Sequence, residues 1–148
     1  MNKGSYIKVM NKVDPYRMYK FGKTTSEDIL ERFDEQTHYR LGWRATPLSR
    51  DYEIKPLWSM WLPKERAVLA ENWFKRTYPK KFISQTDYNG ITECRNWTEE
   101  ESRAFYSFLN EKYPKTEQYW KEINQLKSEG KLGSSYEKVY YIMLTKKQ

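Results

Sequence analysis

Cysteine and long apolar runs are nearly missing from this chain, and each shortage excludes a class of protein. The single cysteine, Cys94, excludes an internal disulfide and a cysteine-rich zinc site. No segment approaches the ~20 apolar residues that a membrane-spanning helix needs. The N-terminal residues also lack the apolar core of a signal peptide. We therefore expect a protein of a reducing, cytoplasmic setting that does not enter membranes.

Acidic residues are also outnumbered. The chain has 20 Asp and Glu against 27 Lys and Arg, which gives a net charge of +7 and a pI near 9.3. Excess positive charge favours polyanions, although a charge of this size can also serve solubility alone. Aromatic residues make up 17% of the chain and are interleaved with the basic ones. This combination suits phosphate contacts and base stacking, so we expect a nucleic-acid partner.

The 148 residues are enough for one domain with a real core. The pattern predicts an α+β fold with a small, three-stranded, mainly antiparallel sheet flanked by helices. The predicted strands are Tyr6–Met10, Tyr16–Phe21 and Tyr52–Leu62, with a short one at Ile91–Arg95. The predicted helices cover 26–36, Pro63 to about Thr77, Thr98 to the residue before Pro114, and 116–128.

The remaining segments divide the chain into two parts. We expect residues 37–51 to form a basic, aromatic loop. The period of residues 136–144 fits a strand or a helix equally well. Residues 1–95 are predicted to form the α+β unit, and residues 96–148 a mostly helical extension packed on the same core.

The segment Tyr19-Lys20-Phe21-Gly22-Lys23-Thr24 is the most informative part of the sequence. We interpret Gly22 as the end of a strand, where a glycine lets backbone and substrate come close. A helix opened by a capping box at Thr25 and Asp28 would follow and carry Arg32 forward. The guanidinium of Arg32 suits the grip of a phosphate, although it could also form a surface ion pair with Asp28.

Glu71 is the candidate metal ligand. It borders the predicted buried stripe of the helix after Pro63, where a carboxylate could hold one hydrated Mg²⁺ or Mn²⁺ ion. The alternative is an ordinary ion pair with Lys75, four residues later.

Other side chains could take part in chemistry near these two. Tyr6 and Tyr19 could position a water, although tyrosines in strands often only pack. His38, the only histidine, could transfer protons or could simply be solvated. Candidate phosphate contacts are Lys20, Lys23, Arg40, Arg44 and Arg50.

The order of these features resembles the GIY-YIG nuclease superfamily over residues 5–95. The likeness is closer to its phage-rich branch, whose second motif reads Lys-Ile-Gly-x-Thr and stands here as Lys20-Phe21-Gly22-Lys23-Thr24. The Ala-x-x-x-Glu helix of that branch resembles 67–71, and its Glu-centred segment resembles Thr92-Glu93-Cys94. Lys20 stands where the second-motif tyrosine would be.

The resemblance implies a metal-dependent endonuclease that hydrolyses phosphodiester bonds in DNA, encoded by a phage and acting in the host cytoplasm. Tyr6 would correspond to the first-motif tyrosine, Arg32 to the phosphate-gripping arginine and Glu71 to the ligand of one divalent ion. Two alternatives remain. The chain could have kept the fold as a nucleic-acid-binding module without catalysis, or it could bind a host protein.

Overall fold

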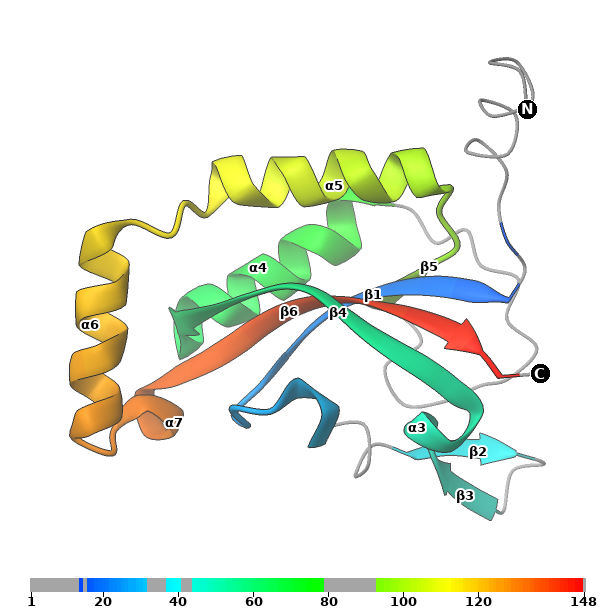
Figure 1. Cartoon of the computed structure of the whole chain (residues 1–148), viewed down its shortest axis with the longest axis horizontal. Coiled ribbons are helices and arrows are strands. Elements are labelled where there is room, and N and C mark those ends of the chain that lie inside the picture. The colour runs from blue at the N-terminus through cyan, green and yellow to red at the C-terminus, as the bar shows by residue number, and fades with distance from the viewer. Residues whose placement is uncertain (1–13, 15, 32–36, 41–43, 79–92, 148) are drawn as a thin grey trace.

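The computed structural model describes residue 14 and residues 16–31, 37–40, 44–78 and 93–147, and it has an α+β fold (Figure 1). The main sheet has four antiparallel strands in the order β4-β6-β1-β5. Its strands are β1 (Arg17–Thr24), β4 (Tyr52–Pro63), β5 (Cys94–Arg95) and β6 (Tyr136–Lys146). A separate two-stranded antiparallel sheet pairs β2 (Thr37–Arg40) with β3 (Arg44–Pro47), and α3 (Leu48–Asp51) follows β3. The α+β class and the antiparallel sheet are confirmed.

The strand β6 lies inside this sheet, so the sheet has four strands where three were predicted. It pairs along its length with β1 on one side and with β4 on the other, so that Tyr140 lies opposite Gly22 and Tyr141 opposite Phe21. The segment is apolar on both faces, because both faces of an interior strand are covered. That continuous apolar run left strand and helix undecided from the sequence. Residues 96–148 therefore contribute a strand as well as helices.

Three helices begin and end as their capping residues predict. They are α4 (Lys64–Thr77), α5 (Glu99–Lys112) and α6 (Glu117–Ser128), and the short α7 (Leu132–Ser135) precedes β6. Pro63 occupies the N-cap of α4. Thr98 and Glu101 form a complete capping box at α5, and the Thr116 hydroxyl accepts from the Tyr119 amide at α6. Gly130 follows α6 with a φ of 68°, a conformation that favours glycine.

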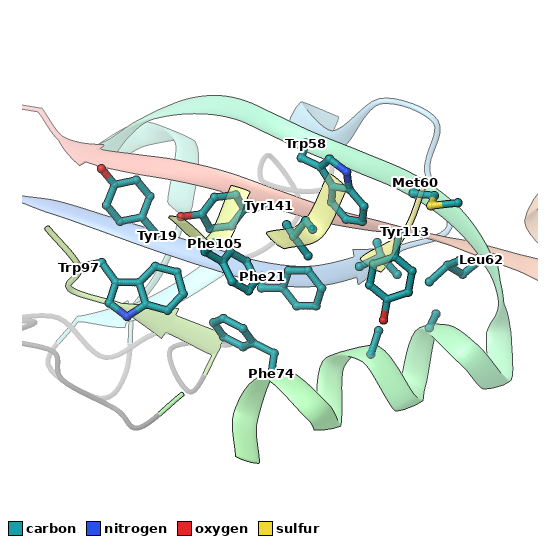
Figure 2. Packing of buried hydrophobic residues seen from close by; sticks show 14 residues of the cluster. Tyr19, Phe21, Trp58, Met60, Leu62, Phe74, Trp97, Phe105, Tyr113 and Tyr141 are labelled. Atoms are coloured by element: carbon teal, nitrogen blue, oxygen red, sulfur yellow. The ribbon is translucent and has the colours of Figure 1, made fainter. Parts of the chain in front are cut away.

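One face of the sheet is covered by α4 and α5. Alternate residues of β1 and β6, including Phe21 and Tyr141, point into this layer and pack on Phe74 of α4 and Phe105 of α5 (Figure 2). Ring centroids in this core lie 4.8–6.4 Å apart, as between Phe105 and Tyr141 or Tyr19 and Trp97. The intervening residues of β1 and β6 face the opposite side of the sheet, where Tyr140 packs in a second cluster.

Four local predictions need correction or fall outside the described residues. Gly22 does not end its strand, because β1 continues to Thr24. The next helix shows its first described turn at 29–31, and Asp28 caps it by accepting from the Leu30 amide, so the predicted capping box is wrong. The described residues of 37–51 form the paired strands β2 and β3 and the helix α3, not a loop. The strand predicted at Tyr6–Met10 lies outside the described residues.

Candidate functional site

Two polar side chains approach the backbone closely at Gly22. A Cβ atom added at Gly22 would lie 2.7 Å from the hydroxyl oxygen of Tyr140 and 3.1 Å from Oε2 of Glu93. Contacts under 3.0 Å essentially do not occur at real Cβ atoms. The glycine is therefore needed for the close approach of two side chains, and it lies within a strand rather than in a turn.

A buried ion pair lies beside this glycine. Nζ of Lys20 is 3.1 Å from Oε2 of Glu93, and the lysine side chain is only 1% exposed whereas that of Glu93 is 16% exposed. Burial by itself lowers the pKa of Lys20, but Tyr140 and Glu93 together raise it above its ordinary value. Lys20 is therefore charged at neutral pH and holds the Glu93 carboxylate next to Gly22.

The second carboxylate comes from α4. Lys75 places its Nζ 3.4 Å from Oε1 of Glu71 and 3.8 Å from Oε1 of Glu93. The Glu71 side chain is 16% exposed and that of Lys75 is 35% exposed. A carboxylate from α4 and one from the segment before β5 thus meet around one ammonium group that solvent can reach. The ion pair of Glu71 with Lys75, predicted as the alternative role of Glu71, is present. Glu93 is the second carboxylate that Lys75 contacts.

We call this group the Gly22 site. It consists of Lys20, Gly22, Glu71, Lys75, Glu93 and Tyr140. Lys23 lies at its margin, with Nζ 2.8 Å from Oε2 of Glu137 on β6. The hydrogen bond to Glu137 is the main cause that raises the pKa of Lys23, and the charges of Glu71 and Glu93 add to it.

Arg95 links α4, which carries Glu71, to the segment that carries Glu93. Its guanidinium lies over the Phe74 ring of α4, 4.7 Å from the centroid. Its Nε donates to the carbonyl oxygen of Tyr78, the C-cap residue of α4, at 2.9 Å. Because Arg95 belongs to β5 and follows Glu93 closely in sequence, these contacts hold the end of α4 near the Glu93 segment.

The structure brings together some of the residues predicted for the site and separates others. Glu71 and Lys20 belong to the Gly22 site. Tyr19 does not, because its ring is buried between Trp97 and Tyr141 on the opposite sheet face. Arg50 is exposed on α3. The residues Tyr6 and Arg32, and the side chains of His38, Arg40 and Arg44, lie outside the described part of the chain.

Sequence reasoning missed Tyr140. It lies at the far end of the chain and reaches Gly22 only because β6 pairs with β1, a long-range pairing that no local motif signals. The Glu93 segment was singled out by its likeness to the Glu-centred segment, and for Glu93 a structural pairing with Arg95 and a catalytic role were equally open. The partner of Glu93 is instead Lys20, the residue at the place of the second-motif tyrosine.

Comparisons with known proteins add no relative. No family model, no curated protein and no solved structure matches the chain. Among the described residues, no helix has both the length and the apolar composition needed to cross a bilayer. The same residues contain no group of three or more His, Cys, Asp or Glu side chains arranged to hold a metal ion.

Proposed function

We propose that the chain is a metal-dependent DNA endonuclease whose centre is the Gly22 site. The observation that carries the proposal is the convergence of Glu71 on α4 and Glu93 before β5 on one solvent-accessible cation, Lys75, beside a glycine. Carboxylate oxygens are the ligands that a hard divalent ion such as Mg²⁺ prefers, and here two carboxylates already surround a cation. The resemblance of the sequence to GIY-YIG nucleases and the net charge of +7 support the same class.

The donor set fits one hydrated Mg²⁺ or Mn²⁺ ion. Mg²⁺ commonly keeps several waters and takes one or two carboxylates from the protein, and Glu71 and Glu93 supply that number. Such an ion, when bound, stabilises charge on the scissile phosphate and lowers the pKa of a bound water. It would have to displace the ammonium of Lys75 from between the carboxylates.

The other residues of the site have separable roles in this proposal. Lys20 holds Glu93 in place from the interior of the protein, because its charge is buried and directed at that carboxylate. Lys75, once displaced, is free to pair with a phosphate oxygen of the substrate. Arg32 is proposed to neutralise the charge that develops on the phosphate in the transition state.

A second candidate is a nucleic-acid-binding module of the same fold without catalysis. The position of Lys75 favours it, because an ammonium between Glu71 and Glu93 already neutralises the cation site. In that case basic and aromatic side chains would bind DNA, and no bond would be cleaved.

The test is cleavage of supercoiled plasmid with Mg²⁺ or Mn²⁺ by the wild type, Glu71→Gln and Arg32→Ala. We expect nicking by the wild type and a loss of at least about 100-fold in each variant, the size typical of removing one group that stabilises the transition state. Glu65→Gln is the matched control, because Glu65 is an exposed carboxylate of the same helix. It should cut like the wild type.

Two outcomes would overturn the proposal in different ways. Cleavage that survives Glu71→Gln would remove the Gly22 site as its centre. Salt-dependent DNA binding by the wild type without cleavage under either metal would favour the binding module instead.

A further inference from the structure

A pair of stacked aromatic rings lies where α4 meets α5. The rings of Trp73 on α4 and Phe108 on α5 are stacked, with centroids 5.8 Å apart and an interplanar angle of 26°. Nζ of Lys112, one turn after Phe108, lies 3.8 Å from the Trp73 centroid. An ammonium over an indole face is a favourable cation–π contact. We call Trp73, Phe108 and Lys112 the aromatic platform.

The platform is apolar and open to solvent. Phe108 is 42% exposed, and Leu69, one turn before Trp73 on α4, is 64% exposed. The core contacts of α5 are made by Phe105 and Leu109, which are buried. Phe108 thus presents an aromatic surface on a chain whose mean hydropathy is −1.03. Exposed apolar side chains gathered on one surface can mark a binding site.

Charged side chains of both signs border these rings. Glu111 follows Phe108 by three residues on α5. Arg66 and Arg76 lie seven residues before and three after Trp73, which places them on the same side of α4. Within the described residues, no carboxylate lies within ion-pair distance of Arg66, Arg76 or Lys112. The acidic first turn of α5, Glu99–Glu101, lies about two helical turns from Phe108. Arg66, Arg76 and Lys112 are therefore the cations of this surface that could pair with phosphates.

We infer that the aromatic platform binds single-stranded nucleic acid, with a base stacked on Phe108 and phosphates paired with Lys112 and Arg76. An aromatic ring can stack only on a base whose face is open, as in a single strand or an unpaired region. A duplex hides those faces and would meet only the cations. The inference rests on the nucleic-acid partner of the proposed function, but not on cleavage.

The platform is separate from the Gly22 site. Glu71 and Lys75 share one side of α4. Trp73 is two residues from each, about 200° around the helix, so it lies on a different side. Phe74 lies between them and faces the sheet. A strand bound on the platform would leave the carboxylates open, so binding and cleavage can be measured independently.

The test is fluorescence anisotropy with a labelled oligothymidine of about 20 nucleotides, longer than the roughly 4–16 that one such binding site covers. Chelator is added so that no cleavage occurs. Loss of one stacking contact commonly weakens binding by about fivefold or more. We expect this loss in Phe108→Ala and in Phe108→Leu, which still covers Trp73 but cannot stack. Tyr106→Ala, at an equally exposed tyrosine on another side of α5, should bind like the wild type.

Several results would overturn the platform. The first is an equal affinity of Phe108→Leu, Tyr106→Ala and the wild type for the oligothymidine. The second is no binding of the oligothymidine by the wild type. The third is a duplex that binds as tightly as the oligothymidine and that Phe108→Leu binds like the wild type. Concentration-dependent self-association that Phe108→Leu abolishes would instead assign the surface to a second copy of the chain. Binding through Phe108 without plasmid cleavage would leave the platform standing and remove the nuclease proposal.

Discussion

At the scale of single residues, Gly22 shows what the sequence could and could not reveal. The sequence pointed to this glycine as the place where the backbone must be approached closely. The approach is real, but it comes from Tyr140 and Glu93 across a sheet rather than from a substrate at a turn. A glycine in a strand often marks such an approach. The identity of the approaching group depends on the fold.

We predict that Gly22→Ala destabilises the protein. The alanine reduces the entropy of the unfolded chain, which is worth about 0.4–1 kcal/mol in its favour. Overpacking costs about 1–3 kcal/mol, and the Tyr140 ring cannot move aside easily because it is 1% exposed. The net loss should be about 1–2 kcal/mol in the free energy of unfolding in urea.

Two further variants make this prediction specific. Gly133→Ala is the control, because its Cβ would make only an ordinary 3.6 Å contact with the Thr25 carbonyl oxygen. It should be neutral or slightly stabilising. Adding Tyr140→Phe to Gly22→Ala removes the clashing hydroxyl and should recover part of the loss. A fully stable Gly22→Ala would contradict the close packing of this site.

At the scale of elements, the helices could be predicted and the last strand could not. Helix ends are set by local chemistry, so Pro63, Thr98 and Thr116 correctly predicted the starts of α4, α5 and α6, in that order. Strand β6 is apolar on both faces, and its two neighbours come from distant parts of the chain. The pairing of β2 with β3 was missed because its residues show no clear period.

The contact between α6 and β6 predicts a dependence on pH. Tyr136 of β6 donates its phenolic proton to Oε1 of Glu122 at 2.5 Å. This hydrogen bond, helped by partial burial, raises the pKa of Tyr136 from 10.0 to about 12. The folded state therefore favours the neutral phenol. Its stabilisation is fully present below pH 10 and is lost as the pH rises towards 12.

The measurement is a spectrophotometric phenolate titration of the wild type minus that of Tyr136→Phe. The difference should titrate near pH 12. Wild type should also be more stable than Tyr136→Phe by about 1 kcal/mol at neutral pH, a modest value because the pair lies near solvent. Glu122→Gln should bring the titration back towards pH 10. A difference that already titrates near 10 in the wild type would rule out the hydrogen bond.

At the scale of the whole molecule, the candidate site depends on segments that are far apart in the sequence. Glu71 and the Glu93 segment were each recognisable by motif, and Lys75 was recognisable as a neighbour of Glu71. The sequence could not show that Lys75 contacts both carboxylates, or that Lys20 is buried under Glu93. The first follows from the packing of α4 against the Glu93 segment, and the second from the pairing of β1 with β5.

The most direct test of the account is titration of the ¹⁵N-labelled protein with Mn²⁺, followed by paramagnetic broadening of the amide signals. A divalent site between the two carboxylates predicts that the signals of Gly22, Glu71 and Glu93 broaden first. Glu71→Gln should weaken this effect, and Lys75→Met should strengthen it, because the competing ammonium is gone. Broadening centred on Glu99–Glu101, or an affinity indifferent to Glu71→Gln, would contradict the account.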